Sequence, residues 1–149
     1  MQQAKKKNKQ ADEALGRSRG GYSSKVHVTV DALGNPRRVR LSAGQVHDLQ
    51  MAVGLIENEP TKAVVADKAY DSDVLIAFIE QAGAQAVIPP KANRLEQRAY
   101  DTNLYADRNK VERFFNRLKH YRRLATRYEK TACNFLAFWH LACCVMLTL

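Results

Sequence analysis

Apolar and polar residues alternate with a period of two from residue 22 onward. Val26, Val28 and Val30 fall on one side of an extended segment, and polar residues fall between them, which is typical of a strand with one buried face. Residues 31–36 contain Gly, Asn and Pro and predict a turn, after which the alternation resumes at residues 37–41. The pattern therefore predicts an antiparallel hairpin with cations on its outward positions.

The middle of the chain switches between short apolar runs and helical spacing, which is typical of α/β proteins. The predicted elements are a helix capped by Asp48 over residues 48–56, a buried strand over 63–66, a helix ending at Gly83 and a strand over 84–88. The adjacent His47 and Asp48 suit a surface histidine beside a helix cap better than metal or acid–base chemistry.

Asp67 directly follows the strand predicted at residues 63–66. Ligands of α/β proteins bind at the carboxyl ends of such strands, so Asp67 is a candidate site residue. Its other role would be to cap the next helix. We disfavour that role, because Asp71, Ser72 and Asp73 already suit it.

Two later segments have the composition of helices. After a loop at residues 89–104, residues 105–119 place one apolar face opposite a polar stripe; that face consists of Val111, Phe114, Phe115 and Leu118. Residues 131–149 are almost wholly apolar and approach the length of about 20 residues that a membrane span needs. Because Asn134 and His140 interrupt this segment, a buried core helix is the preferred interpretation.

The composition adds a strong positive charge to this outline. The 149 residues carry a formal net charge of +9, which indicates a polyanionic partner and above all nucleic acid. Residues 1–21 form a basic, glycine-containing segment without an apolar signal region. We expect it to be a flexible arm that either contacts DNA phosphates or stays solvated. Three cysteines without zinc-site spacing are expected to be reduced core residues: Cys133, Cys143 and Cys144.

The helix at residues 105–119 carries one further pattern. Tyr105, Arg108, Glu112 and Lys119 lie on one stripe of a helix, with two, three and six residues between them. An amphipathic surface helix with ion pairs would explain the charges alone. The four residues at these gaps, however, closely resemble the signature around the last acidic residue of bacterial Asp-Asp-Glu (DDE) transposases of insertion-sequence families four and five. The family also has an upstream aspartate at the end of an apolar strand, a position that Asp67 occupies.

The resemblance runs from about residue 14 to residue 149 and implies a ribonuclease-H-like, retroviral-integrase-like α/β fold, with a mixed sheet and flanking helices. Residues 22–149 would be part of a catalytic domain for DNA transposition. In that family three carboxylates hold two magnesium ions, which activate the nucleophile and stabilise the leaving oxygen during phosphodiester hydrolysis and strand transfer. By resemblance, Asp67 and Glu112 are two of these catalytic, metal-binding carboxylates.

The resemblance also implies where DNA binds. Tyr105, Arg108 and Lys119 of the motif would contact phosphates beside the cleaved strand. Eight basic residues lie between positions 113 and 130, and a solvated helix face explains only some of them, so we extend the DNA-binding set. The added residues are Arg113, Arg117, Arg122 and Arg123. The expected location is the bacterial cytoplasm, at the nucleoid, and no membrane partner is expected.

One part of the family pattern is missing. The family's first catalytic aspartate lies on a strand before the hairpin, and the chain has no such strand; Asp12, Glu13 and Asp31 do not lie on one. Family members are often encoded in two overlapping frames, so the partner that completes the site would be an upstream-frame product, with a homo-oligomer as the other partner considered. We expect the chain to be inactive alone. The alternative is a non-catalytic DNA-binding regulator or a remnant of a transposase.

Overall fold

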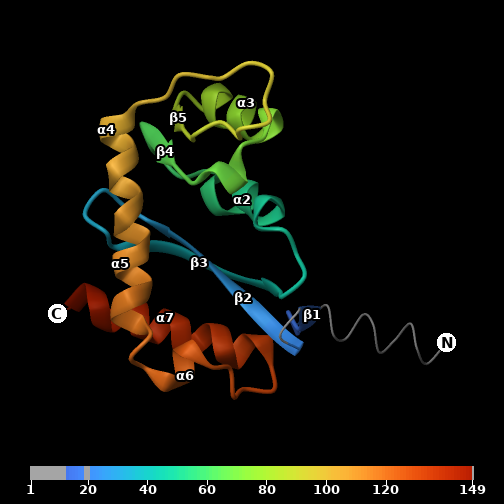
Figure 1. Cartoon of the computed structure of the whole chain (residues 1–149). Coiled ribbons are helices and arrows are strands. Elements are labelled where there is room, and N and C mark those ends of the chain that lie inside the picture. Colours follow the sequence, from blue (N-terminus) through green and yellow to red (C-terminus); the bar gives the residue numbers. More distant parts are fainter. Residues whose placement is uncertain (1–12, 19–20, 149) are drawn as a thin grey trace.

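The computed structural model describes residues 13–18 and 21–148, and its strands form two separate sheets (Figure 1). The first sheet is antiparallel, in the order β1–β2–β3, with β1 at Gly16–Ser18, β2 at Gly21–Val30 and β3 at Pro36–Ala43. The second sheet pairs two parallel strands, β4 at Ala63–Val65 and β5 at Gln85–Val87. The mixed α/β class is confirmed, whereas a single mixed sheet is not observed in the described residues.

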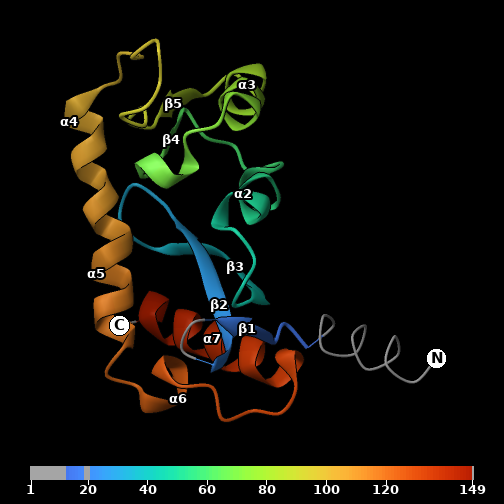
Figure 2. The ribbon, with the colours of Figure 1, turned by 45° about the vertical axis from the view of Figure 1, so that its right-hand side comes forward.

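Helices surround the two sheets. In chain order they are α2 Asp48–Ile56, α3 Asp73–Gln81, α4 Thr102–Tyr105, α5 Asn109–Leu118, α6 Arg122–Ala125 and α7 Ala132–Thr148, with two 3-10 turns, η1 Lys68–Tyr70 and η2 Ala106–Arg108. Figures 1 and 2 both show α4 and α5 as one column beside both sheets, with α7 beneath the first sheet. The α4–α5 column is therefore the helical segment that lies beside both the first and the second sheet.

The predicted hairpin is confirmed. Val28 on β2 lies opposite Val39 on β3, and the turn between the strands is closed by the Asp31 carboxylate, which accepts hydrogen bonds from the Asn35 and Leu33 amides at 2.9 and 2.8 Å. Burial alone would raise the pKa of Asp31, but these hydrogen bonds lower it below its usual value. Gly34 has φ +88°, a conformation that glycine adopts without steric cost.

One apolar core lies between the first sheet and helices α5 and α7. Its buried members are Val39, Phe114, Leu118, Leu124, Phe135, Trp139 and Cys143. The valine face of β2 packs against it, as the alternation predicts, and Phe114 and Leu118 are only 1% exposed. Because Phe114 and Leu118 lie four positions apart on α5, they fix which face of that helix turns outward.

A second core lies between the second sheet and helices α2 and α3. Its buried members are Ala52, Leu75, Ile76, Ile79, Ala84 and Ile88. The strand predicted at residues 63–66 is present as β4, although it is half-buried, not buried. Two cores in one small chain mean that β4 and α5 belong to different packing units.

The C-terminal helix differs from the prediction of a buried core helix. Phe135 and Trp139 are buried, but Leu141, Val145 and Leu147 are exposed on α7. Within the described part of the chain, no helix is long and apolar enough to cross a membrane.

The three cysteines are free. Cys143 is buried, which raises its pKa to about 11, whereas Cys133 and Cys144 are exposed and the prediction of core positions is wrong for them.

The basic arm predicted at residues 1–21 lies partly outside the described residues, which exclude 1–12 and 19–20. Its described part is not a free tail. Gly16–Ser18 form β1, and Glu13 Oε2 accepts a hydrogen bond from the Ala132 amide, at 2.7 Å. The chain is thus attached to the start of α7 three residues before its first strand.

A buried carboxylate fixes the loop that leads from β5 to α4. The Asp71 side chain is 0% exposed and lies 2.6 Å from Arg94 Nε and 3.2 Å from an Arg98 guanidinium nitrogen, and it accepts a hydrogen bond from the Lys91 amide at 2.8 Å. Burial alone would raise its pKa, but these donors lower it. Asp71 is therefore a loop anchor, contrary to its predicted role as a helix cap.

We expect Asp71→Asn to destabilise the fold by about 2–3 kcal/mol, because it removes the charge that compensates two arginines at a buried position. Asp73→Asn is the matched control. Asp73 pairs with the same Arg94, at 2.6 Å, but is 82% exposed, so its loss should cost less than about 1 kcal/mol. Urea denaturation midpoints measure both effects. Equal midpoints for the two variants would contradict the anchoring role.

Candidate functional site

Three residues of the predicted signature lie together at the junction of α4 and α5. The Arg108 guanidinium is 2.7 Å from Glu112 Oε1 and lies over the Tyr105 ring, 6.0 Å from its centroid. Tyr105 in turn meets Tyr100 edge to face, with ring centroids 5.5 Å apart. The helix spacing therefore predicts this contact correctly, although residues 106–108 form the 3-10 turn η2 and not part of one continuous α-helix.

Lys119, the fourth residue of the signature, is at the C-terminal end of α5. Its Nζ donates to Asn116 Oδ1 at 3.0 Å. It lines a different cavity, beside Tyr22 and Trp139 on the side of α5 that faces the first sheet and α7. The structure thus gathers Tyr105, Arg108 and Glu112 and places Lys119 apart from them.

Asp67 lies where the sequence predicts, just beyond the carboxyl end of β4. Its Oδ1 accepts a hydrogen bond from the Ala69 amide at 2.8 Å and caps η1. Asp67 therefore caps a 3-10 turn and not the next helix, α3, whose N-cap is Ser72 as the sequence analysis allows. That role uses one carboxylate oxygen, and the described residues offer no hydrogen-bond partner to the other, so the side chain keeps an oxygen for a ligand.

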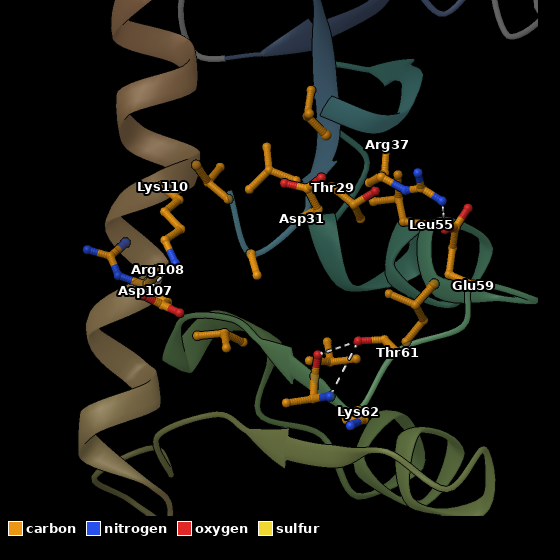
Figure 3. A pocket seen from close by; sticks show the side chains of 18 of the residues that line it. Thr29, Asp31, Arg37, Leu55, Glu59, Thr61, Lys62, Asp107, Arg108 and Lys110 are labelled. Atoms are coloured by element: carbon orange, nitrogen blue, oxygen red, sulfur yellow. Dashed lines mark hydrogen bonds and ion pairs between the residues drawn. The ribbon is translucent and has the colours of Figure 1, made fainter. Parts of the chain in front are cut away.

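A cavity of about 500 Å³ lies between β2, β4 and the α5 column (Figure 3), and neither Asp67 nor Glu112 is among the residues that line it. Val65 at the end of β4 and Val111 on α5 both line it. Asp67 follows Val65 by two residues and Glu112 follows Val111 directly, so each candidate acid lies on a segment that contributes a lining residue. The position of Asp67 relative to Glu112 is therefore set by how the segment after β4 packs beside α5, and not by the geometry of α5 alone.

The two candidate carboxylates are the kind of ligand that Mg²⁺ prefers, but two carboxylates are fewer than the three that the family uses. Asp67 and Glu112 offer the hard carboxylate oxygens that Mg²⁺ prefers. In the part of the chain that the structure describes, however, there is no group of three or more His, Cys, Asp and Glu side chains that could hold a metal ion. The described residues therefore do not form a three-ligand metal site by themselves.

The sequence analysis missed a polar cluster beside Asp67. Lys25 Nζ is 3.0 Å from Asp48 Oδ1, so Asp48 pairs with a strand instead of capping α2, whose N-cap is His47 without a side-chain hydrogen bond. Burial, and then the nearby charges of Asp48 and Asp67, raise the pKa of Tyr70 to about 12. The adjacent His47 and Asp48 were the only sequence signal for this neighbourhood.

His27 is buried in the same neighbourhood, on β2. Its Nε2 is 2.7 Å from Ser42 Oγ. Burial lowers its pKa below 6.5; the Asp48 charge opposes the shift and Lys25 adds to it. His27 is therefore held in its neutral form inside the sheet.

The basic residues after Glu112 divide into two kinds. Arg113, Arg117 and Arg122 are exposed, and the described residues provide no ion-pair partner for them. Arg123 is also exposed but lies over the Phe138 ring, 5.3 Å from its centroid. Arg127 is structural, since it donates to Glu13 O at 2.8 Å and to Ser24 Oγ at 2.6 Å.

A strand-end aspartate and a helix glutamate that is followed by exposed arginines do not by themselves identify a class of protein, and comparison with known proteins does. The chain belongs to the DDE transposase family, because the family model for the transposase DDE domain matches residues 2–147.

Two relatives agree with this assignment. A transposase of insertion sequence element IS6501 from Brucella ovis is 40% identical over 126 residues, which cover 83% of this chain and 97% of the relative. A transposase of insertion sequence element IS402 from Burkholderia cepacia is 32% identical over 135 residues, covering 83% of this chain and 62% of the relative. The first relative is therefore no longer than this chain, and the second extends well beyond it. No solved structure matches.

The buried His27 makes stability depend on pH. Because its folded-state pKa lies below 6.5, the unfolded chain binds the proton more readily, and stability is fully present above that pH and is lost as pH falls below it. We expect His27→Gln to reduce this loss of stability at pH values below about 6.5. Thermal unfolding at a series of pH values measures it. The exposed His120→Gln is the control, and an equal reduction in that variant would contradict the assignment.

Proposed function

We propose that this chain is the C-terminal catalytic part of a transposase and handles DNA in transposition, with Asp67 and Glu112 as two of its three metal-binding carboxylates. The observation that supports the proposal is that both acids follow, by one or two residues, a residue that lines the same cavity, Val65 for Asp67 and Val111 for Glu112. The family match and the names of both relatives support transposition as the process. Residues 22–149 would form this part, preceded by the basic arm, in the bacterial nucleoid.

The described residues contain no group of three carboxylates that would complete the proposed metal site. Asp67 and Glu112 would each give oxygen ligands to Mg²⁺, which in the complete enzyme supplies electrostatic stabilisation and nucleophile activation. Two carboxylates leave such a site short of ligands, so we propose that the isolated chain binds DNA without cleaving it. A polypeptide that contributes the remaining aspartate would complete the site.

The Arg108–Glu112 pair has a second use in this proposal. Arg108 is 34% exposed and Glu112 is 52% exposed, so a phosphate or a cation can compete for either partner. A guanidinium binds two phosphate oxygens at once. Arg108 would then exchange Glu112 for a DNA phosphate while Glu112 turns to metal, and Tyr105 would keep the guanidinium in place.

Exposed cations extend the surface beyond the site. Arg113 and Arg117 lie four residues apart and so point from the same side of α5, where both are exposed and turned away from the buried Phe114 and Leu118 by about 100° around the helix. Lys119, Arg122 and Arg123 follow along the chain. This arrangement favours contact with a phosphate backbone over recognition of bases.

A non-catalytic DNA-binding regulator, or a remnant of a transposase, is the second candidate. The observation that favours it is the absence of a three-carboxylate group in the described residues. Both candidates bind DNA, so only a requirement for Glu112 in catalysis separates them.

We expect Glu112→Gln to abolish nicking when the chain is co-expressed with the polypeptide encoded upstream in its element. The nicking rate should fall by more than about a hundredfold, because mutation of residues that only support metal ligands already lowers activity by up to about that factor. Nicking of a plasmid that carries the element, with and without Mg²⁺, measures it. DNA binding should persist, since the substitution removes a negative charge. Retained nicking in the variant would exclude Glu112 as a ligand, and no nicking by the unmodified pair would support the regulator.

The double variant Arg113→Gln, Arg117→Gln should weaken DNA binding at every sequence. Because each phosphate contact releases a counterion, the slope of log affinity against log salt should fall by about 2. Arg17→Gln, Arg40→Gln removes the same charge from two exposed positions that line neither cavity and is the matched control. Fluorescence anisotropy over a salt series measures both. An equal fall in the two double variants would show that net charge, not this face of α5, sets the affinity.

A further inference from the structure

The contact between Tyr105, Arg108 and Glu112 is supported by a side chain outside the signature. Tyr100 meets the Tyr105 ring edge to face, with 5.5 Å between the ring centroids and 78° between the ring planes. This geometry suits the charge distribution of aromatic rings, whose edges are positive and whose faces are negative. Tyr100 therefore contacts the same ring over which the Arg108 guanidinium lies.

The backbone on both sides of Tyr100 is fixed. Two residues before it, an Arg98 guanidinium nitrogen lies 3.2 Å from Asp71 Oδ1 and 3.2 Å from the Ile88 carbonyl oxygen. Directly after it, Asp101 Oδ1 accepts hydrogen bonds from the amides at positions 103 and 104, at 2.9 and 3.0 Å, and so caps α4. Because consecutive Cα atoms are about 3.8 Å apart, these two attachments hold Tyr100 close to the start of α4.

The turn η2 brings Arg108 over Tyr105. In a 3-10 turn, side chains three positions apart eclipse each other, and Ala106–Arg108 forms such a turn with Tyr105 as its N-cap. The guanidinium carbon is accordingly 6.0 Å from the centroid of the Tyr105 ring. The position of the guanidinium therefore follows the position of that ring.

Charge alone does not determine which acid Arg108 pairs with. Asp107 is its neighbour in the chain and Glu112 lies four residues beyond it. Figure 3 shows Asp107, Arg108 and Lys110 close together on the α5 column beside the cavity. Lys110 pairs with Asp107 at 2.7 Å, and Arg108 pairs with Glu112 at 2.7 Å. Partly exposed pairs at this spacing are weak by themselves, so the aromatic contacts that hold the guanidinium contribute to this choice.

We propose that Tyr100 is a positioning residue, which acts through Tyr105 to hold the Arg108 guanidinium beside Glu112. The inference rests on the proposed function, in which Arg108 binds a DNA phosphate and Glu112 a metal ion. Tyr100 binds neither of them in this role. It determines where the guanidinium lies when a phosphate arrives, so its loss should weaken DNA binding only as long as Arg108 is present.

A double-mutant cycle on DNA affinity tests this dependence. Tyr100→Ala should weaken binding of a fluorescent DNA duplex, measured by anisotropy without Mg²⁺, by about threefold or more. In the Arg108→Gln background the same substitution should have little further effect, because the group that Tyr100 positions is already gone. A loss of general packing would instead lower the affinity by the same factor in both backgrounds.

A conservative variant and a matched control complete the experiment. Tyr100→Phe keeps the ring and its edge-to-face contact, and it should bind DNA as the unmodified chain does. Tyr128→Ala removes a tyrosine that is 56% exposed and lies outside this stack, and it should leave the affinity unchanged.

A measurement on the free chain makes the test independent of DNA. The NMR signal of the Arg108 Nε–H group reports whether the guanidinium still lies over the face of the Tyr105 ring. The signal should shift in Tyr100→Ala and keep its position in Tyr100→Phe and Tyr128→Ala.

Four results would overturn the inference: an unchanged Arg108 signal in Tyr100→Ala, unchanged DNA affinity in that variant, an equal loss of affinity in both backgrounds, or no rescue by Tyr100→Phe. If the unmodified chain bound no DNA, the proposed function would fail, and the Arg108 signal would still decide the positioning role. The nicking experiment with Glu112→Gln does not depend on Tyr100, so failure of this inference leaves it standing.

Discussion

The interaction on which the rest of the structure depends is the buried carboxylate of Asp71. It lies directly after the η1 turn that Asp67 caps, and its donors Lys91, Arg94 and Arg98 all come from the loop before α4. One side chain therefore ties the segment of the first candidate acid to the segment that leads to the second. A charge with no exposed surface is stable only while it is fully paired, so this loop has little freedom to move.

The elements before and after the Asp71 loop pack in two different apolar cores. β4, α2 and α3 pack around Ile79 and Ile88, whereas β2, β3, α5 and α7 pack around Phe114 and Trp139. The acids follow this division: Asp67 belongs to the first set and Glu112 to the second. The chemistry proposed for the pair therefore depends on how the two sets are positioned, more than on either residue's immediate surroundings.

The sequence was a reliable guide where structure depends on near neighbours. Alternation around Val28 and the turn glycine Gly34 predict the hairpin, and three- and four-residue spacing predicts the contact of Tyr105, Arg108 and Glu112. The sequence was a poor guide where the structure depends on contacts between residues that are far apart along the chain. Nothing near Asp71 indicates Arg94 and Arg98 as its partners, and neither the two-sheet arrangement nor the separation of Asp67 from Glu112 has a local signature. The three-carboxylate site and the ribonuclease-H-like fold remain predictions.

The two cores have a consequence for the motions of the chain. Units with separate apolar cores open as separate cooperative blocks, each with its own free energy of opening. In the described residues no backbone ladder crosses from β2 to β4, so cooperativity between the blocks relies on α5, α2 and the anchored loop. The distance between the two carboxylates is then a thermally fluctuating quantity. The relative position of the two candidate acids then depends on the elements that connect the two blocks, and not on the sequence around either acid.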